Sequence, residues 1–361
     1  MHRMRARLVP VFLATLALVG CSSAARPDSA GQAVPGATSS PSAAASGVAH
    51  LGAMVSSSPS RPAAPATRPP AGCTIFPADN AWHADVSRLP VAANSAALVA
   101  SIGTGAAVHA DFGSGTWQGA PIGIPITTVP AGQAGVAVSF QYRDESDPGP
   151  YPVPANAAIE GGTGSTGDRH VIVYDPAHCR DYELFAARPA SGGSWQAGSG
   201  AIFDLRGNAL RKAGWTSADA AGLPILAGLV RYDEVAAGHI DHAIRVTVPR
   251  SRNTYLWPAR HAASDSSDPS LPPMGLRLRL KAGVSLAALP TQARVVARAM
   301  QQYGVIVADN GSAWYISGAP DSRWNNDALH ALGGLNGSDF EAVDASGLMI
   351  SANSAQARSS G

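Results

Sequence analysis

The sequence contains little charge and almost no lysine. Asp, Glu, Lys and Arg together make up 14% of the 361 residues, and the two lysines are Lys212 and Lys281. The formal net charge is only +1, so we expect no basic surface and no nucleic-acid partner. Glycine and proline are instead abundant, with 38 and 28 residues. This composition favours turns, loops and apolar strands over charged helices.

Several motifs that would identify a catalytic or metal site are also missing. The chain has no Gly-x-Ser-x-Gly, no His-Glu-x-x-His and no Cys-x-x-Cys. Glycines are dense between Gly161 and Gly167, but no Gly-Lys-Ser/Thr follows them. We therefore interpret this stretch as a flexible turn rather than a phosphate-binding loop, and we expect no cofactor and no resident metal.

The first residues have the pattern of a bacterial export signal. Three arginines precede residues 8–20, an uncharged apolar run that is shorter than the ~20 residues of a membrane-spanning helix. The run ends in Leu18-Val19-Gly20-Cys21, which resembles a lipobox. We expect cleavage of a signal peptide 1–20, which leaves a net charge of −2. The alternative is a plain secretory signal with a chance cysteine.

These features predict a lipid-anchored protein outside the cytoplasm. Acyl chains on Cys21 would make the membrane a partner and hold the domain in the periplasm or outside the cell, from the cell membrane or the outer membrane. Residues 22–72 are rich in Ser, Ala and Pro and contain no Phe, Trp or Tyr. We interpret 21–72 as the lipidated cysteine with a disordered tether. All seven Trp lie at Trp82 or beyond, which places one folded domain at 73–345 and a disordered tail at 346–361.

Two cysteines remain if Cys21 carries lipid. Cys73 and Cys179 both fall in the expected domain. An oxidising compartment favours a disulfide between them, although two buried free thiols are the alternative.

Short apolar runs separated by turn residues predict many strands and few helices. The strands are expected at 123–129, 135–142, 170–174, 182–185, 201–205, 243–248, 255–257, 276–280, 305–308 and 314–316. Helices are expected at 95–102, 292–303 and 325–332. The fold class is therefore β-rich α+β, with an antiparallel sandwich or jelly-roll-like core and a few peripheral helices.

Five segments carry a resemblance to a family of secreted bacterial hypothetical proteins with no established activity. The resemblance covers residues 73–343, and the segments are 145–152 (ESDPGPYP), 167–171 (GDRHV), 228–234 (GLVRYDE), 257–261 (WPARH) and 308–312 (ADNGS). It implies export and a single domain, and it assigns no catalytic residue.

One cluster of ionisable residues stands out in a chain with so little charge. Its members are Glu160, Asp168, Arg169, His170 and Glu183. The segment from Asp175 to Arg180 has the composition of a hairpin turn, and pairing these two residues places Ile172 opposite Glu183. His170 and Glu183 then share one face of the sheet, two positions apart.

A histidine between carboxylates suits general acid–base chemistry, so we expect this cluster to be catalytic and to line one cleft. In that arrangement, the other three members lie on the rim of the cleft. The alternative is a salt-bridge network that anchors a loop.

Three other groups were considered as metal ligands. His239 and His242 would point to opposite faces of a strand and are expected at the surface, whereas His109 and Asp111 share a face but lack a third ligand. Asp144, Glu145 and Asp147 would suit calcium, with a solvated turn as the alternative.

Two classes of function fit these observations. The first is a carbohydrate-active enzyme, a glycoside hydrolase or polysaccharide lyase, with exposed tryptophans that stack on sugar rings. The second is a non-catalytic envelope module that binds glycan or another protein.

Overall fold

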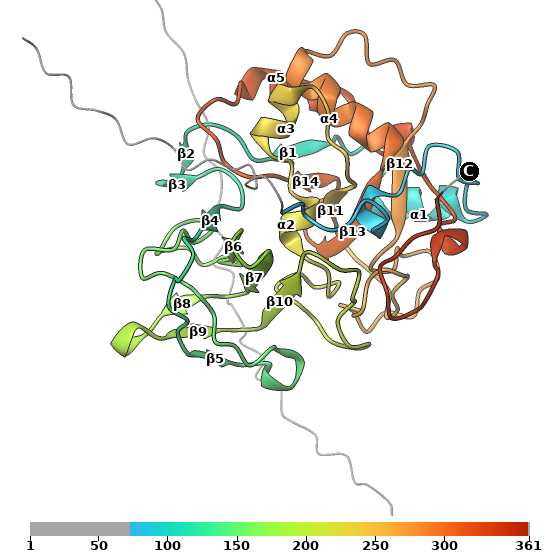
Figure 1. Cartoon of the computed structure of the whole chain (residues 1–361). Coiled ribbons are helices and arrows are strands. Elements are labelled where there is room, and N and C mark those ends of the chain that lie inside the picture. Colours follow the sequence, from blue (N-terminus) through green and yellow to red (C-terminus); the bar gives the residue numbers. More distant parts are fainter. Residues whose placement is uncertain (1–72, 360–361) are drawn as a thin grey trace, which may run out of the picture. The chain divides into compact units, whose positions relative to one another are not determined.

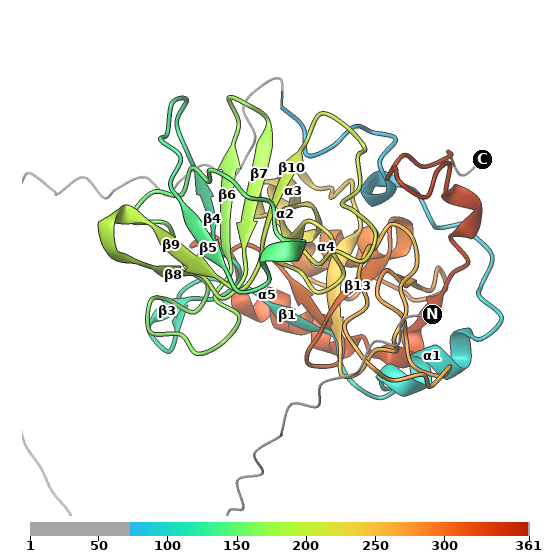
Figure 2. The same ribbon diagram turned by 90° about the horizontal axis from the view of Figure 1, so that it is seen from below.

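The computed structural model describes residues 73–359, and the ribbon is shown in Figures 1 and 2. The expected signal peptide, the lipid-bearing Cys21 and the tether lie outside the described residues. Within residues 73–359, no helix combines the length and apolar character needed to cross a membrane.

The largest sheet has six strands in the order β1-β14-β11-β13-β12-β15. These are β1 (His109–Asp111), β14 (Tyr315–Ser317), β11 (Ile244–Val248), β13 (Val305–Asn310), β12 (Arg277–Leu280) and β15 (Phe340–Ala342). β1 runs parallel to β14 and β11 runs parallel to β13, while the remaining pairs are antiparallel. The sheet is therefore mixed.

A second sheet has four strands in the order β10-β7-β6-β4, namely β10 (Gly200–Asp204), β7 (Arg180–Leu184), β6 (Val171–Asp175) and β4 (Ile126–Thr128). A three-stranded sheet consists of β5 (Val138–Phe140), β9 (Trp195–Ala197) and β8 (Arg188–Pro189). β2 (Thr116–Trp117) and β3 (Ala120–Pro121) form a short hairpin. In chain order, this hairpin connects β1 of the first sheet to β4 of the second.

Helices are short and lie mainly on the six-stranded sheet (Figure 1). They are α1 (Ser95–Ile102), α2 (Ile225–Gly228), α3 (Tyr232–Ala237), α4 (Thr291–Gln302) and α5 (Asn326–His330). The 3-10 helices are η1 (Ala81–His83), η2 (Arg143–Glu145), η3 (Ser191–Gly193), η4 (Ala331–Gly334), η5 (Gly337–Asp339) and η6 (Ser346–Leu348). The apolar stripe of α4, which includes Val296 and Met300, is buried, and the helix packs against β12, α3 and α5.

The β6–β7 hairpin is buried on both faces, and this places it between two hydrophobic clusters. Ile172 and Tyr174 belong to the main core beneath the six-stranded sheet. Val171 and Val173 face the opposite way and pack in a smaller core with Trp195. Because alternate side chains of a strand point to opposite faces, β6 joins the two cores.

The β-rich α+β class is confirmed, with the described strands in several sheets and the helices outside them. The sheets also contain parallel pairs, which an antiparallel sandwich or jelly-roll-like core does not include, because β4 pairs parallel with β6 and β5 pairs parallel with β9. The runs 123–129 and 135–142 consequently belong to different sheets and do not form a hairpin. Residues 255–257 form no strand and contribute one isolated bridge, between Tyr255 and Met274.

The end of the described chain is ordered, so the expected disordered tail is wrong for residues 346–359. Gln356 bridges to Asn80, and Ser354 bridges to Ala209. The side chain of Gln356 also donates to Asp79, with Nε2 2.7 Å from Oδ2. These small polar residues are held by pairing with residues far away in sequence, which no local pattern indicates.

The Cys73–Cys179 disulfide is confirmed and joins residues 106 positions apart. It links the beginning of the described chain to the turn between β6 and β7.

Candidate functional site

The predicted register of the β6–β7 hairpin is confirmed. Asp175 pairs with Arg180, and Ile172 pairs with Glu183. His170 directly precedes β6, and its ring lies 6.0 Å from that of Phe185 between centroids. The alternation of apolar residues and the turn composition were sufficient to place these side chains.

His170 is buried and pairs with Glu160. Its Nδ1 lies 2.6 Å from Oε2 of Glu160, and its Nε2 lies 3.1 Å from the carbonyl oxygen of Ala218. Both ring nitrogens therefore face acceptors, which favours the imidazolium form. Burial lowers the pKa of His170, but the charge and hydrogen bond of Glu160 outweigh it and raise the pKa to about 9.

Glu160 keeps its negative charge for the same reason. Burial raises the pKa of its carboxyl, but the charge of His170 and its hydrogen bonds outweigh that effect and hold the pKa below the ordinary value. The side chain is 26% exposed, whereas that of His170 is 2% exposed. Glu160 is therefore the accessible member of the pair.

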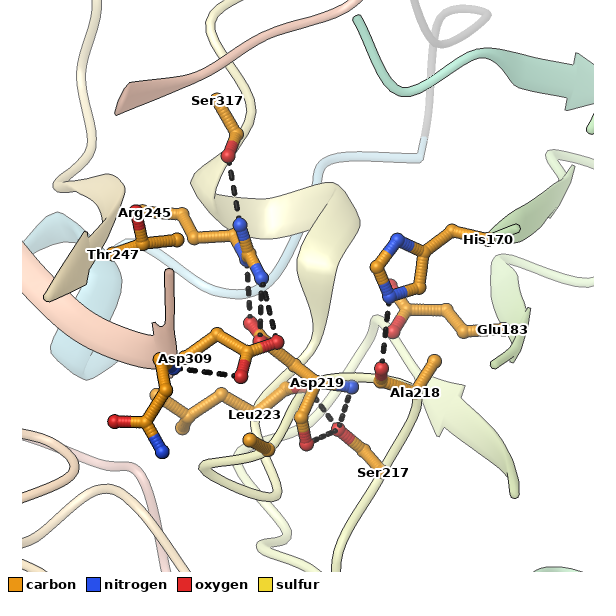
Figure 3. A network of polar contacts seen from close by, with 12 residues as sticks. His170, Glu183, Ser217, Ala218, Asp219, Leu223, Arg245, Thr247, Asp309 and Ser317 are labelled. Carbon is orange, nitrogen blue, oxygen red and sulfur yellow. Dashed lines mark hydrogen bonds and ion pairs between the residues drawn. The ribbon is translucent and has the colours of Figure 1, made fainter. Parts of the chain in front are cut away.

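Glu183 does not interact with His170 in the expected way. Its Oε1 accepts a hydrogen bond from the backbone of Leu226 at 2.9 Å, and its side chain is completely buried. Figure 3 shows it near His170, but no hydrogen bond joins the two in the described part of the chain. The prediction that His170 and Glu183 face a shared cleft is therefore wrong, because both lie in the interior.

Arg169 and Asp168 do not complete the expected rim. The guanidinium of Arg169 is buried and donates to four carbonyl groups, those of Gly162, Thr163, Ser165 and Ala187. It thus holds the glycine-rich loop 161–167 in place, as in the loop-anchor alternative. Asp168 is exposed and lies on the surface of the same loop.

A second buried cation, Arg245, organises residues that the sequence did not bring together. Its guanidinium donates to both carboxylate oxygens of Asp219 at 2.9 Å, to Oγ of Ser317 at 2.8 Å and to Oδ2 of Asp309 at 3.2 Å. Asp219 directly follows Ala218, the residue that accepts from His170 (Figure 3). The two buried cations therefore meet at the same loop.

A β-bulge places Asp309 in this network. Val246 of β11 pairs with Val307 of β13, but the next residue, Thr247, pairs with Asp309 because the register shifts by one. Ala308 is the extra residue, and the shift moves Asp309 to the face that Arg245 occupies. Bulges commonly redirect a side chain in this way next to functional sites.

The Asp309 carboxyl is partly exposed, and its pKa lies near neutral pH. Burial and the charge of Asp219 raise its pKa to about 7, against the lowering effect of Arg245 and His170. Its side chain is 20% exposed, while that of Asp219 is completely buried. It is therefore the member of this network that both titrates near neutrality and can be reached from solvent.

Asp111 completes the group at the end of β1. It pairs with Ser317 in the strand register, which places it on the face of Arg245. Burial raises the pKa of its carboxyl, and the charge of Glu160 raises it further, while His109 and Arg245 lower it. We define the candidate centre as Glu160, His170, Asp219, Arg245, Asp309 and Asp111.

The remaining metal hypotheses do not converge on a site. Within residues 73–359, no group of three or more His, Cys, Asp or Glu side chains is placed to hold a metal ion. Asp147 pairs with Arg211 at 2.5 Å, and Glu145 accepts from the backbone of Thr216. Two of the three carboxylates expected to suit calcium are thus engaged elsewhere, and Asp144 is exposed.

His242 was expected at the surface and is instead buried. Its Nε2 lies 2.9 Å from Nη2 of Arg231 and 3.3 Å from Oε2 of Glu234. His239 is exposed and lies near Asp241 instead.

Part of the centre had a recognisable signal in the sequence. Asp309 lies in the Ala-Asp-Asn-Gly-Ser segment, and Arg245 is the charged residue of a largely apolar strand. A charged residue on a buried strand requires a partner and is itself a signal.

No family model, curated protein or solved structure matches this chain.

Proposed function

We propose that this chain is a cell-envelope lipoprotein whose folded domain acts on carbohydrate and cleaves polysaccharide by acid–base chemistry at Asp309 and Glu160. One observation carries the proposal: two partly exposed carboxyls flank the buried cations His170 and Arg245, and their pKa values move in opposite directions. Neighbouring carboxyls with divergent pKa values are typical of an acid paired with a base.

In this reaction one carboxyl acts as the general acid and the other as the general base. Protonated Asp309 donates its proton to the oxygen of the glycosidic bond as that bond breaks. Ionised Glu160 accepts a proton from a water molecule whose oxygen adds to the anomeric carbon. Arg245 orients Asp309, and charged His170 keeps Glu160 ionised, so both cations act as positioning residues.

The test is a screen of purified protein against soluble polysaccharides, with new reducing ends as the readout. Asp309→Asn and Glu160→Gln should each lower the rate by roughly 10²–10⁴-fold, the usual contribution of a general acid or base. Because Asp309 must carry a proton, the wild-type rate should fall as pH rises through about 7.

The matched control is Asp144→Asn, since Asp144 is an exposed carboxylate on η2. It should retain wild-type activity and pH dependence. Melting temperatures of all variants separate a lost reaction from a lost fold. A polysaccharide cleaved equally well by wild type and by Asp309→Asn would contradict the assignment.

The second candidate is a non-catalytic module that binds glycan or protein. It is favoured because the polar groups of the candidate centre already have hydrogen-bond partners within the protein. Arg245 donates to Asp219, Ser317 and Asp309, and both ring nitrogens of His170 face acceptors. A protein that binds a polysaccharide without releasing reducing ends would support this candidate.

The anchor is a separate part of the proposal and rests on the first 21 residues. Acylated Cys21 would hold the domain at the cell membrane or outer membrane. The variant Cys21→Ala should then leave the membrane fraction and appear in the soluble fraction. Retention of that variant in membranes would show that the anchor lies elsewhere.

A further inference from the structure

Trp117 differs from the other tryptophans because its indole ring is largely in solvent. It is 71% exposed, whereas Trp82, Trp195, Trp314 and Trp324 are at most 4% exposed and belong to the cores. Folding therefore gains little from burying Trp117. A single exposed apolar residue is common on protein surfaces, so its position must decide whether it has a role.

The hairpin that carries Trp117 is well defined at its tip. Trp117 of β2 pairs directly with Ala120 of β3. The two residues between them, Gln118 and Gly119, have φ values of 50° and 84°. Positive φ at both central positions is typical of the type I′ turn that closes a two-residue β-hairpin. The strand partner and the turn together fix the backbone that carries the indole, and with it the direction of the Cα–Cβ bond.

The base of the hairpin is fixed to the body of the domain. The backbone N–H of Gly113 donates to the carbonyl of Ile122 at 3.1 Å. Asn326 of α5 accepts from the backbone of Ser114 at 2.8 Å and donates to its carbonyl at 3.0 Å. An aromatic ring on such a support loses little conformational freedom when it binds a ligand.

The hairpin also packs against the loop that follows Glu160 of the candidate centre. Ala120, the strand partner of Trp117, is buried against Gly162, where an added Cβ would come within 3.3 Å of the Ala120 Cβ. Gly162 is two residues beyond Glu160, and Arg169 holds its loop. On the other side, β1 ends at Asp111, six residues before Trp117, and Figure 1 shows the hairpin at the edge of the domain, between β1 and β4. Both supports of Trp117 therefore lead to residues of the candidate centre.

From this arrangement we propose that Trp117 is a binding platform for the sugar units of a polysaccharide that extends away from the candidate centre. A flat, exposed indole matches the apolar C–H face of a pyranose ring. This inference rests on the proposed function and specifies its ligand as a chain longer than the units at Asp309 and Glu160. Trp117 binds and does not take part in bond cleavage.

The experiment compares wild type, Trp117→Ala, Trp117→Tyr and Tyr142→Ala by affinity electrophoresis. The gels contain a polysaccharide that slows the migration of the wild-type protein. Trp117→Ala should weaken retention about ten-fold, the size expected for one lost stacking contact. Trp117→Tyr should restore most of it, because an aromatic face is kept. Tyr142→Ala removes another exposed aromatic ring, 48% exposed on a different loop, and should bind as wild type does.

Cleavage assays separate this inference from the proposed function. Trp117→Ala should lose activity on long chains while turning over a short aryl glycoside at the wild-type rate. Equal binding of polysaccharide by wild type and Trp117→Ala would overturn the inference and leave the proposed function standing. Binding that depends on Trp117 in a protein without cleavage would overturn the catalytic assignment and support the platform. A wild type that neither binds nor cleaves any polysaccharide overturns both.

Discussion

Buried charge in this domain is handled in two different ways at the level of single residues. Arg245 is surrounded by Asp219, Ser317 and Asp309, so its charge is compensated by hydrogen-bonded partners. Removing one partner of such a buried pair typically costs about 3–5 kcal/mol, because the other charge is left uncompensated. The fold therefore depends on the same contacts that set the protonation of the candidate centre.

Asp181 and Glu183 on β7 lack any such cation. Both side chains are completely buried and lie on one face of the strand, and Tyr174 of the neighbouring strand β6 pairs with Asp181. As two carboxylates they would present only acceptors to each other. Burial, the charge of Glu183 and a hydrogen bond between the two carboxyls raise the pKa of Asp181 well above its ordinary value. These effects favour a proton on Asp181 in the folded state.

The replacement Asp181→Asn tests this pair. A raised pKa in the folded state stabilises the protein fully below the unfolded-state value of about 4, and this contribution is lost as pH rises toward the folded-state pKa. The wild-type free energy of unfolding should fall through this window by up to about 1.4 kcal/mol per pH unit. Asn keeps the shape of the Asp side chain, and its amide N–H donates to Glu183. The variant should therefore lose less stability than the wild type as pH rises.

Chemical denaturation at pH 5 and pH 8 measures the difference. The stability of Asp181→Asn relative to wild type should be greater at pH 8 than at pH 5, and the exposed Asp144→Asn should follow wild type at both. Parallel pH dependence of wild type and Asp181→Asn would show that Asp181 is not protonated in the folded state.

The candidate site was only half predictable from individual residues. His170 and Glu160 could be related because one hairpin and the loop before it bring them together. Glu183 was assigned to the wrong partner, because periodicity gives the face of a strand but not which neighbour covers that face. Here the backbone N–H of Leu226 in α2 donates a hydrogen bond to Glu183.

At the level of elements, local patterns predicted strands and helices well and their irregularities poorly. Helix α1 spans residues 95–102 as expected, and Asn325 caps α5 by accepting from the N–H of Ala328. The bulge in β13 has no equivalent local signal, yet it decides that Asp309 faces Arg245. A one-residue change of register reverses the face of every side chain that follows, so this part of the site could not be read from the sequence.

The loop 161–167 shows a similar limit. Its glycines indicated a turn, as observed, but they gave no sign that side-chain contacts would hold the turn in place. Arg169 supplies these contacts by donating to Gly162, Thr163 and Ser165. Its own φ of 54° is in the left-handed region, a conformation that non-glycine residues adopt only where surrounding contacts hold them.

At the level of the whole molecule, long-range pairing was the least predictable feature. The order of strands in the six-stranded sheet places β1 beside β14, and about two hundred residues of chain lie between them. The β-rich composition is compatible with many such orders. The two cysteines were the exception, because with Cys21 assigned to lipid they could pair only with each other.

The Cys73–Cys179 disulfide and the C-terminal segment hold the first described residues together. The bond closes a loop of 106 positions, and the N–H of Ala357 donates to the carbonyl of Asp79 at 2.7 Å. Because the second contact survives reduction, Cys73→Ser/Cys179→Ser should still fold. We expect the double variant to lose about 2–4 kcal/mol of stability. This is below the roughly 4.7 kcal/mol that the chain-entropy model gives for a loop of this length.

Thermal unfolding of wild type with and without reductant, beside the double variant, measures this contribution. The melting temperature should fall by roughly 5–10 °C in both reduced wild type and variant, as the size of the domain implies. The variant itself should be insensitive to reductant, which is the internal control. An unchanged melting temperature would mean that the C-terminal segment alone holds residues 73–91, and complete unfolding would mean that it contributes nothing without the covalent bond. An intermediate loss is expected because the loop entropy belongs to the unfolded chain, whereas the contacts of Asp79 and Asn80 with residues 354–357 remain available to the folded one.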